Sequence, residues 1–240
     1  MASMETKEEL VFRKQLFLIA GCSGIVIAVG YAFLPIAFAI SGFPLPSEAS
    51  QWVTYLEGKT NIWWWIIWIS IITNILYLPF AYGLYELLKK NYKALIMISG
   101  VLFALFVFLE LSITWTNYPA IIELSQKYNL ASSETQKLVI LSAIEFASAS
   151  FQTPVTAFYT IVIPSLATIL ASYVMFKNKA FGKTIPLIGF ISGICNVISV
   201  WGGYFYEPLE KLVMPGSFLV LFWFAGIGVK FIKLSKSYKF

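Results

Sequence analysis

The sequence lacks histidine and aspartate altogether, and it has a single arginine, Arg13. Imidazole is the commonest metal ligand in proteins and the usual proton carrier near neutral pH. Its absence therefore excludes a haem or copper centre held by histidine, and it excludes histidine-based acid–base catalysis. All twelve acidic residues are glutamates. This narrow set of reactive groups predicts no metal and no other cofactor.

Charged residues are also scarce: they make up 12% of the 240 residues, against 59% for hydrophobic residues. A soluble domain carries about a quarter charged residues. The apolar runs are continuous, whereas the strands of a membrane β-barrel alternate between apolar and polar residues. The composition therefore predicts an all-α, polytopic helical membrane bundle, built as one integral membrane domain over residues 1–240.

Six apolar segments are each close to the ~20 residues that cross a bilayer. We predict spans at about 16–40, 62–86, 94–117, 153–176, 185–206 and 212–232. Thirteen basic residues then fall on one side, in the two terminal segments and two short connections, and four fall on the other. Because lysine and arginine mark the cytoplasmic side, we expect both termini in the cytoplasm. The net charge of +5 then reflects topology, and no nucleic-acid partner is expected.

The segment 134–176 is too long for one span. A straight helix of this length would extend about 64 Å at 1.5 Å per residue, roughly twice the ~30 Å hydrocarbon core. Ser133 and Gln136 form a capping-box pattern that predicts a helix start near Glu134, and Pro154 predicts a break. Two spans here would give seven in total and would move the basic C-terminus to the opposite side. We therefore predict six spans, with 134–152 as an extra amphipathic helix at the outer face.

One carboxyl group falls inside an apolar run: Glu110, 17 residues beyond Lys93. An ionised carboxylate in hydrocarbon costs several kcal/mol unless it is protonated, paired or hydrated. On a regular helix, Thr114 and Asn117 lie on the same face as Glu110. The spacing therefore predicts a polar stripe that opens toward the outer side.

Four further polar residues are candidates for the same site. Glu145 and Gln152 lie on one face of the predicted outer helix, and Asn74 and Asn196 fall near the midplane of their spans. Together with Glu110, Thr114 and Asn117, they form our predicted ligand-binding set. Both glutamates can instead be protonated or hydrogen-bonded tethers between helices. No nucleophile accompanies them, so no catalytic residue is predicted.

Tryptophan and small residues follow the predicted spans. All eight tryptophans fall in the outer half, where they act either as interfacial anchors or as the lining of a pocket for an amphiphile or quaternary amine. The segments KQLFLIAGCSGI (14–25) and KTIPLIGFISGI (183–194) align without a gap, and KALIMISGV (93–101) is a shorter version. They are either copies of one helical unit or a chance match in a restricted alphabet. Their small-xxx-small spacing predicts close helix packing.

Two longer stretches carry a family resemblance. The residues YGLYELLKKNYKALIMISGV (82–101) and SYVMFKNKAFGKTIPLIGFISGI (172–194) resemble a prokaryotic family of six-span membrane proteins grouped only as a domain of unknown function. The shared pattern is a span ending in Gly-x-Tyr-x-Leu-Leu, a lysine-rich turn, and a later restart after Phe-Gly-Lys. The resemblance covers about 82–232 and implies six helices in a prokaryotic inner membrane. It implies no activity and no site residue.

These observations leave three functional hypotheses. The first is a non-enzymatic protein whose outward-facing cavity at Glu110 binds or passes a cation or an amphiphile, with membrane lipids as partners. The second is an accessory subunit that packs against partner membrane proteins, or against a second copy, through small-residue faces. The third is an intramembrane enzyme, which requires a second carboxylate close to Glu110.

Overall fold

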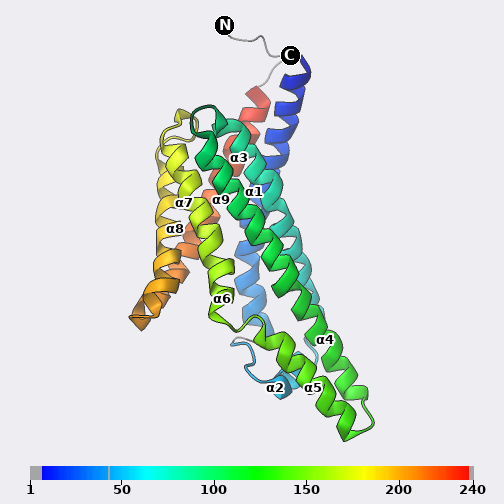
Figure 1. Cartoon of the computed structure of the whole chain (residues 1–240). Helices are drawn as coiled ribbons and strands as arrows, with labels where there is room; N and C mark the ends of the chain where they lie inside the picture. The colour runs from blue at the N-terminus through cyan, green and yellow to red at the C-terminus, as the bar shows by residue number, and fades with distance from the viewer. Residues whose placement is uncertain (1–6, 43, 238–240) are drawn as a thin grey trace.

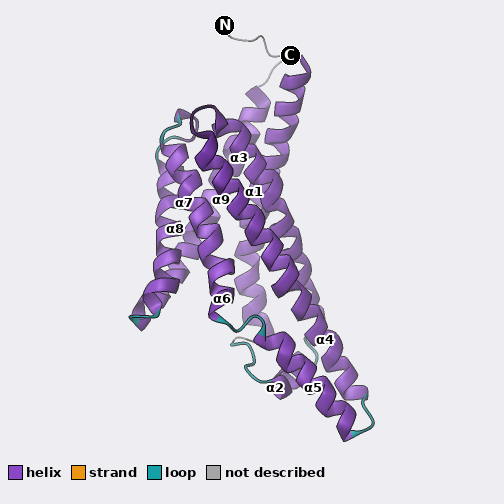
Figure 2. Cartoon of the chain, in the orientation of Figure 1, coloured by secondary structure: helices purple, strands orange, loops and turns teal. Residues whose placement is uncertain are grey.

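The computed structural model describes residues 7–42 and 44–237, which contain helices and no strand (Figures 1 and 2). The α-helices are α1 (Lys7–Ser41), α2 (Ala49–Leu56), α3 (Thr60–Leu109), α4 (Trp115–Leu130), α5 (Glu134–Ala149), α6 (Pro154–Ala157), α7 (Ile163–Phe176), α8 (Thr184–Gly203) and α9 (Val213–Ser237). Two π-helical segments, η1 (Glu110–Thr114) and η2 (Phe158–Val162), and two short 3₁₀ segments, η3 (Lys179–Phe181) and η4 (Glu207–Leu212), connect them. The predicted all-α fold class is confirmed.

Six segments of the described chain are long and apolar enough to cross a membrane. They are Glu8–Ser41, Thr60–Lys90, Tyr92–Leu130, Pro154–Phe176, Thr184–Gly203 and Glu207–Ser237. Helix α3 contributes to two of them, because the backbone at Tyr92 leaves the helical region (φ −137°, ψ 45°). Ring contacts of Tyr77 with Phe106 and of Trp63 with Tyr118 show that the two arms run antiparallel. The lysine-rich stretch 89–93 is therefore the tip of a helical hairpin.

The bundle has two distinct ends (Figure 1). Helix α1 begins and α9 ends at the same end, which we call the termini end. The opposite end carries α2, α4 and α5, and we call it the hairpin end. Between them, α1 packs against α3 and α9, α7 packs against α3 and α8, and α8 packs against α9.

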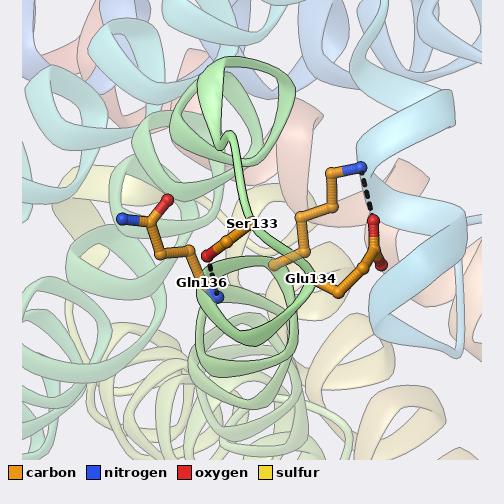
Figure 3. Close-up of polar contacts among 4 residues, drawn as sticks. Ser133, Glu134 and Gln136 are labelled. Carbon is orange, nitrogen blue, oxygen red and sulfur yellow. Dashed lines mark hydrogen bonds and ion pairs between the residues drawn. The ribbon is translucent and has the colours of Figure 1, made fainter.

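The extra helix of the predicted fold is α5. It runs back along α4 and also packs on α2, so α4 and α5 form a hairpin at the hairpin end (Figure 1). The predicted start is confirmed: Ser133 is the N-cap, and its hydroxyl accepts a hydrogen bond of 3.3 Å from the backbone N–H of Gln136 (Figure 3). An ion pair of 3.1 Å joins Glu134 to Lys137 in the first turn. Helix α5 ends at Ala149, and the chain resumes as a helix at Pro154, which suits the first helical turn because it needs no N–H there.

The buried core has two parts. The part that we call the phenylalanine core lies between α1, α3, α7 and α9. Its largest wholly buried side chains are Phe17, Phe80, Phe103, Trp223, Phe224 and Phe231. The part that we call the tryptophan core lies at the hairpin end, around Trp52 of α2, Trp63 of α3, Tyr118 of α4 and Ile144 of α5. Helix α5 and the short α2 thus complete a core that the long helices leave open.

Glycine allows the closest helix crossing. A Cβ atom added to Gly228 of α9 would lie 2.8 Å from the carbonyl oxygen of Gly21, and one added to Gly24 would lie 3.0 Å from that of Phe224. The predicted small-residue pairs are used within the chain in the same way. Gly24 faces α9, and Gly193 of α8 faces the carbonyl oxygen of Ser165 in α7. These helix faces are therefore occupied by neighbours in the same chain.

Candidate functional site

Glu110 is the first residue of the π segment η1, and only 6% of its surface is exposed. Its carboxyl group faces polar groups of Asn74, Thr114 and Trp115, although the Trp115 N–H is not aligned on any acceptor in the described chain. No ion pair joins Glu110 to a basic side chain of the described residues. The site is therefore a buried carboxyl group that only neutral groups contact.

Tyrosines surround this carboxyl group. Three of them, Tyr31, Tyr77 and Tyr118, lie close enough for its charge to act on their hydroxyl groups. The Tyr31 hydroxyl donates a hydrogen bond of 3.5 Å to the side-chain oxygen of Asn74, and the rings of Tyr31 and Tyr77 are in contact, with centroids 6.2 Å apart. A chain of polar groups thus leads from Tyr31 through Asn74 to Glu110.

A second polar contact involves Thr114, which also faces Glu110. The hydroxyl groups of Thr114 and Tyr159 are 3.0 Å apart and form a hydrogen bond. Tyr159 belongs to the second π segment, η2, so this hydrogen bond joins the two π segments of the described chain directly. Single π turns occur frequently at functional sites. The structure therefore brings together the two irregular segments and the buried carboxyl group.

A proline follows each of the two π segments. Pro119 follows η1 and Pro164 follows η2, and a proline inside a helix removes one backbone hydrogen bond and collides with the carbonyl group four residues earlier. Threonine hydroxyls satisfy nearby carbonyl groups: Thr116 donates to Leu111 and Thr160 donates to Thr156, both at 2.8 Å.

The π turn also changes which residues share a face with Glu110. A regular helix would bring Asn117 to this face, whereas the wider turn brings Tyr118, which is buried. Asn117 instead points toward the end of α5, where its amide donates to the hydroxyl of Ser150 at 2.7 Å. The same amide also donates to the carbonyl of Ile113, one turn earlier in the chain, at 2.8 Å. Of the predicted stripe, Thr114 lies beside Glu110 and Asn117 connects α4 to the segment after α5.

Glu145 and Gln152 hold α2 in place. Glu145 Oε2 accepts a hydrogen bond of 3.1 Å from the backbone N–H of Ala49, the first residue of α2. The side chain of Glu48, at the N-cap of α2, makes no capping bond, so Glu145 supplies the acceptor that this helix end requires. Gln152 donates to the carbonyl of Pro46 at 3.1 Å. The two predicted ligands thus fasten α2 to α5.

The two asparagines have different environments. Asn74 lies next to Glu110 and is 3% exposed. Asn196 lies at the crossing of α8 and α9, where its side chain leaves no room for a Cβ atom at Gly216. One turn away, the Ser192 hydroxyl donates to the Gly216 carbonyl at 2.7 Å. The structure therefore places Asn196 in a helix contact, outside the set of groups around Glu110.

Glu110 is enclosed by its neighbours, with 6% of its surface exposed. The surface hollows evident in the described residues lie elsewhere, one on the first turns of α1 and one at the turn between α4 and α5. No group of three glutamates or cysteines that could hold a metal ion gathers within residues 7–42 and 44–237. The arrangement can accept a proton or a small bound cation more readily than a bulky molecule.

The four tyrosines of the site were missed from the sequence: Tyr31, Tyr77, Tyr118 and Tyr159. Membrane proteins concentrate tyrosine at the two interfaces, where its hydroxyl meets water. A tyrosine near the middle of an apolar run was therefore a usable signal. Asn74 and Tyr77, three residues apart, also share a helix face with each other.

The fold and the packed carboxyl group define a class: a multi-pass integral membrane protein with six apolar spans and an accessory helix. Within this class the chain belongs to the DUF4386 family, described as a domain of unknown function, whose model matches residues 19–229. The resemblance noted from the sequence is confirmed, and the match extends further toward the N-terminus. Neither a curated protein nor a solved structure matches the chain.

Proposed function

We propose that this protein is a non-enzymatic membrane protein that holds or passes a cation, the proton included, at Glu110. One observation carries the proposal: a carboxyl group inside a membrane span is 6% exposed and forms no ion pair within the described chain. A buried carboxylate must be neutralised by a proton or by a bound cation. Intramembrane carboxyl groups of this kind mark ion and proton pathways.

The surrounding groups support this proposal. Hydroxyl and amide oxygens can coordinate a small cation or take part in proton transfer, and tyrosine faces attract positive charge. Thr114 and Tyr159 join the two π segments beside the carboxyl group. The basic end segments of α1 and α9 support a topology in which both termini lie on the cytoplasmic side of the inner membrane.

The two alternative hypotheses have less support. An accessory subunit would offer its small-residue faces to a partner, but Gly21, Gly24 and Gly228 pack against each other's helices within this chain. An intramembrane enzyme would need a second carboxylate beside Glu110, but Glu145 is hydrogen-bonded to α2. An amphiphile would need a hollow at Glu110, but the evident hollows lie elsewhere.

The test is labelling with dicyclohexylcarbodiimide, an apolar reagent that adds to protonated carboxyl groups in hydrocarbon. The addition has no leaving group, and rearrangement gives a stable N-acylurea that mass spectrometry can locate. We expect wild-type protein in lipid nanodiscs to gain one adduct, on Glu110. The labelling rate should fall when the pH is raised or when a bound cation occupies the site.

Two variants control this experiment. Glu110→Gln keeps the shape of the side chain and should lose the adduct, whereas Glu145→Gln should keep it, because Glu145 lies in α5 and binds α2. The proposal is wrong if folded wild-type protein gains no adduct on Glu110. It is equally wrong if the labelling rate is independent of pH and of sodium, potassium and tetramethylammonium.

A further inference from the structure

Most of the buried polar atoms that lack a hydrogen-bond partner in the described chain belong to three helices, α2, α3 and α4. Eight buried side-chain polar atoms make no hydrogen bond within the described residues. Five of them belong to α2, α3 and α4, and we call these five residues the donor seam: Trp52, Trp63, Ser70, Trp115 and Ser125. A buried donor without an acceptor carries the full cost of losing water, so five in one region need an explanation.

The donor seam extends from Glu110 to the hairpin end. Ser70 lies one turn from Asn74 on the buried face of α3, and Trp63 lies two turns further toward α2. Tyr118 is at its centre, with ring centroids 5.0 Å from Trp63, 5.6 Å from Trp115 and 6.1 Å from Trp52. Ser125 continues the buried face of α4 two turns beyond Tyr118. The five residues therefore follow the buried faces of α3 and α4 toward Trp52 of α2.

The packing of the rings limits what can satisfy these donors. Rings whose centroids are 5.0–6.1 Å apart touch each other, so no organic cation fits between them. Indole N–H groups donate and cannot accept, so their partner must offer an oxygen lone pair. Water is the smallest such partner, and buried water typically bonds to polar groups that would otherwise be unsatisfied.

We propose that the donor seam binds a row of water molecules that carries protons between Glu110 and the hairpin end. This inference rests on the proposed function and narrows its ligand class: the cation that Glu110 exchanges is the proton. The titratable groups that face Glu110 are tyrosines, Tyr31 on α1, Tyr77 on α3, Tyr118 on α4 and Tyr159 on η2. A tyrosine hydroxyl ordinarily keeps its proton at neutral pH, so Glu110 is the group of this set that can exchange one there.

Helix α2 closes the outer mouth of this path. Trp52 is fully buried, with its ring centroid 5.9 Å from that of Trp63 and 6.2 Å from that of Phe151. Glu145 of α5 binds the first residue of α2, Ala49, and Gln152 binds Pro46 in the segment before α2. Release of these two hydrogen bonds would let α2 move and expose the donor seam to water at the hairpin end.

The first test measures deuterium exchange of the indole N–H groups in ¹⁵N-tryptophan protein. Trp223 is the internal control, because its N–H is also buried and unpartnered but lies on α9, against Gly189 of α8. We expect the N–H groups of Trp52, Trp63 and Trp115 to exchange about 100-fold faster than that of Trp223, because Trp223 lies in the phenylalanine core, whose long helices must open before its N–H can exchange. Each tryptophan signal is assigned by its loss in a variant with that tryptophan replaced. Phenylalanine and tyrosine are both tried at each position, and one folded variant per position is enough.

The second test separates this inference from the proposed function. Carbodiimide labelling of Glu110 is compared at constant pH in sodium, potassium and tetramethylammonium chloride. We expect equal rates in the three salts and a dependence on pH alone. Protection by one of these cations would overturn the proton assignment while leaving the proposed function intact. Exchange of the three seam indoles no faster than Trp223 would overturn the water path, whatever Glu110 does.

Discussion

The two halves of the core differ in the size of the side chains between their helices. In the phenylalanine core, α1 and α9 approach until backbone atoms touch, because Gly21, Gly24 and Gly228 carry no side chain. In the tryptophan core, large rings fill the space between the helices, with Trp52 and Trp63 wholly buried. Van der Waals packing supports both halves, since lipid supplies little hydrophobic drive for helix association.

The halves also differ in what holds them from outside. The phenylalanine core is enclosed by the long helices α1, α3, α7 and α9. The tryptophan core depends on the eight-residue helix α2 and on α5, which attach through the side chains of Glu145, Gln152 and Asn117. Short elements held by a few side-chain hydrogen bonds open more easily than a core helix. The half that contains the donor seam is therefore the half that can open.

The largest expected effect is at Trp63. We predict that Trp63→Ala lowers the free energy of unfolding by about 3–5 kcal/mol, because it removes a fully buried ring between Phe38, Trp52 and Tyr118. Unfolding in mixed detergent micelles, followed by circular dichroism, measures it. Trp65→Ala is the matched control: this ring is 65% exposed, and its loss should cost under about 1 kcal/mol. Equal losses would mean that the tryptophan core does not support the fold.

The next largest effect is in the other half. Gly228→Ala would place a Cβ atom 2.8 Å from the carbonyl oxygen of Gly21 and 3.0 Å from the backbone nitrogen of Ile25. Because backbone cannot move aside as a side chain can, we predict a loss of about 1–3 kcal/mol in the free energy of unfolding.

Gly100→Ala is the control for Gly228→Ala, since no atom lies within 4 Å of the added Cβ. Alanine favours the helix over glycine by up to about 1 kcal/mol, so this variant should be neutral or more stable in the same measurement. If the two variants behaved alike, close contact between α1 and α9 would not explain the packing of the phenylalanine core.

Features that depend on local pattern could be predicted from the sequence. Apolar run length predicted six spans, and the Ser133 and Gln136 pattern predicted the start of α5 at Glu134, because both depend on neighbours within a few residues. The placement of Thr114 beside Glu110 also follows from helical spacing. These are properties of one helix at a time.

Features that depend on irregular turns or on neighbouring helices could not be predicted in the same way. The extrapolation from Glu110 to Asn117 assumed a regular helix, and the π turn before Pro119 brought Tyr118 to that face instead. The position of Asn196 along its span predicted its depth in the membrane but not the helix that it contacts. Its side chain lies against Gly216 of α9. The tryptophans were treated as one set, although Trp52, Trp63 and Trp223 are buried while Trp65, Trp68 and Trp201 are exposed.

A smaller effect is expected where α2 attaches. Glu145→Ala removes the acceptor of the Ala49 N–H, and loss of a helix cap costs about 1 kcal/mol. We predict faster amide hydrogen exchange across residues 49–56, with exchange in the phenylalanine core unchanged. Glu134→Ala is the control, because Glu134 is exposed and pairs only with Lys137 in the described structure. Unchanged exchange in α2 would show that Glu145 does not hold the tryptophan core closed.

The smallest predicted effect uses two serines from the aligned Ser-Gly segments. Ser99 donates a hydrogen bond of 2.7 Å to the carbonyl of Ala167 in α7, whereas Ser23 donates at 2.8 Å to Ile19 in its own helix. Hydrogen bonds between membrane helices average about 0.6 kcal/mol, so Ser99→Ala should lower the free energy of unfolding by about that amount. Ser23→Ala should change it by less, since the Ile19 carbonyl keeps its place in the backbone ladder of α1. Equal losses in mixed-micelle unfolding would mean that the bond between α3 and α7 adds nothing to helix packing, and that shape alone holds the phenylalanine core together.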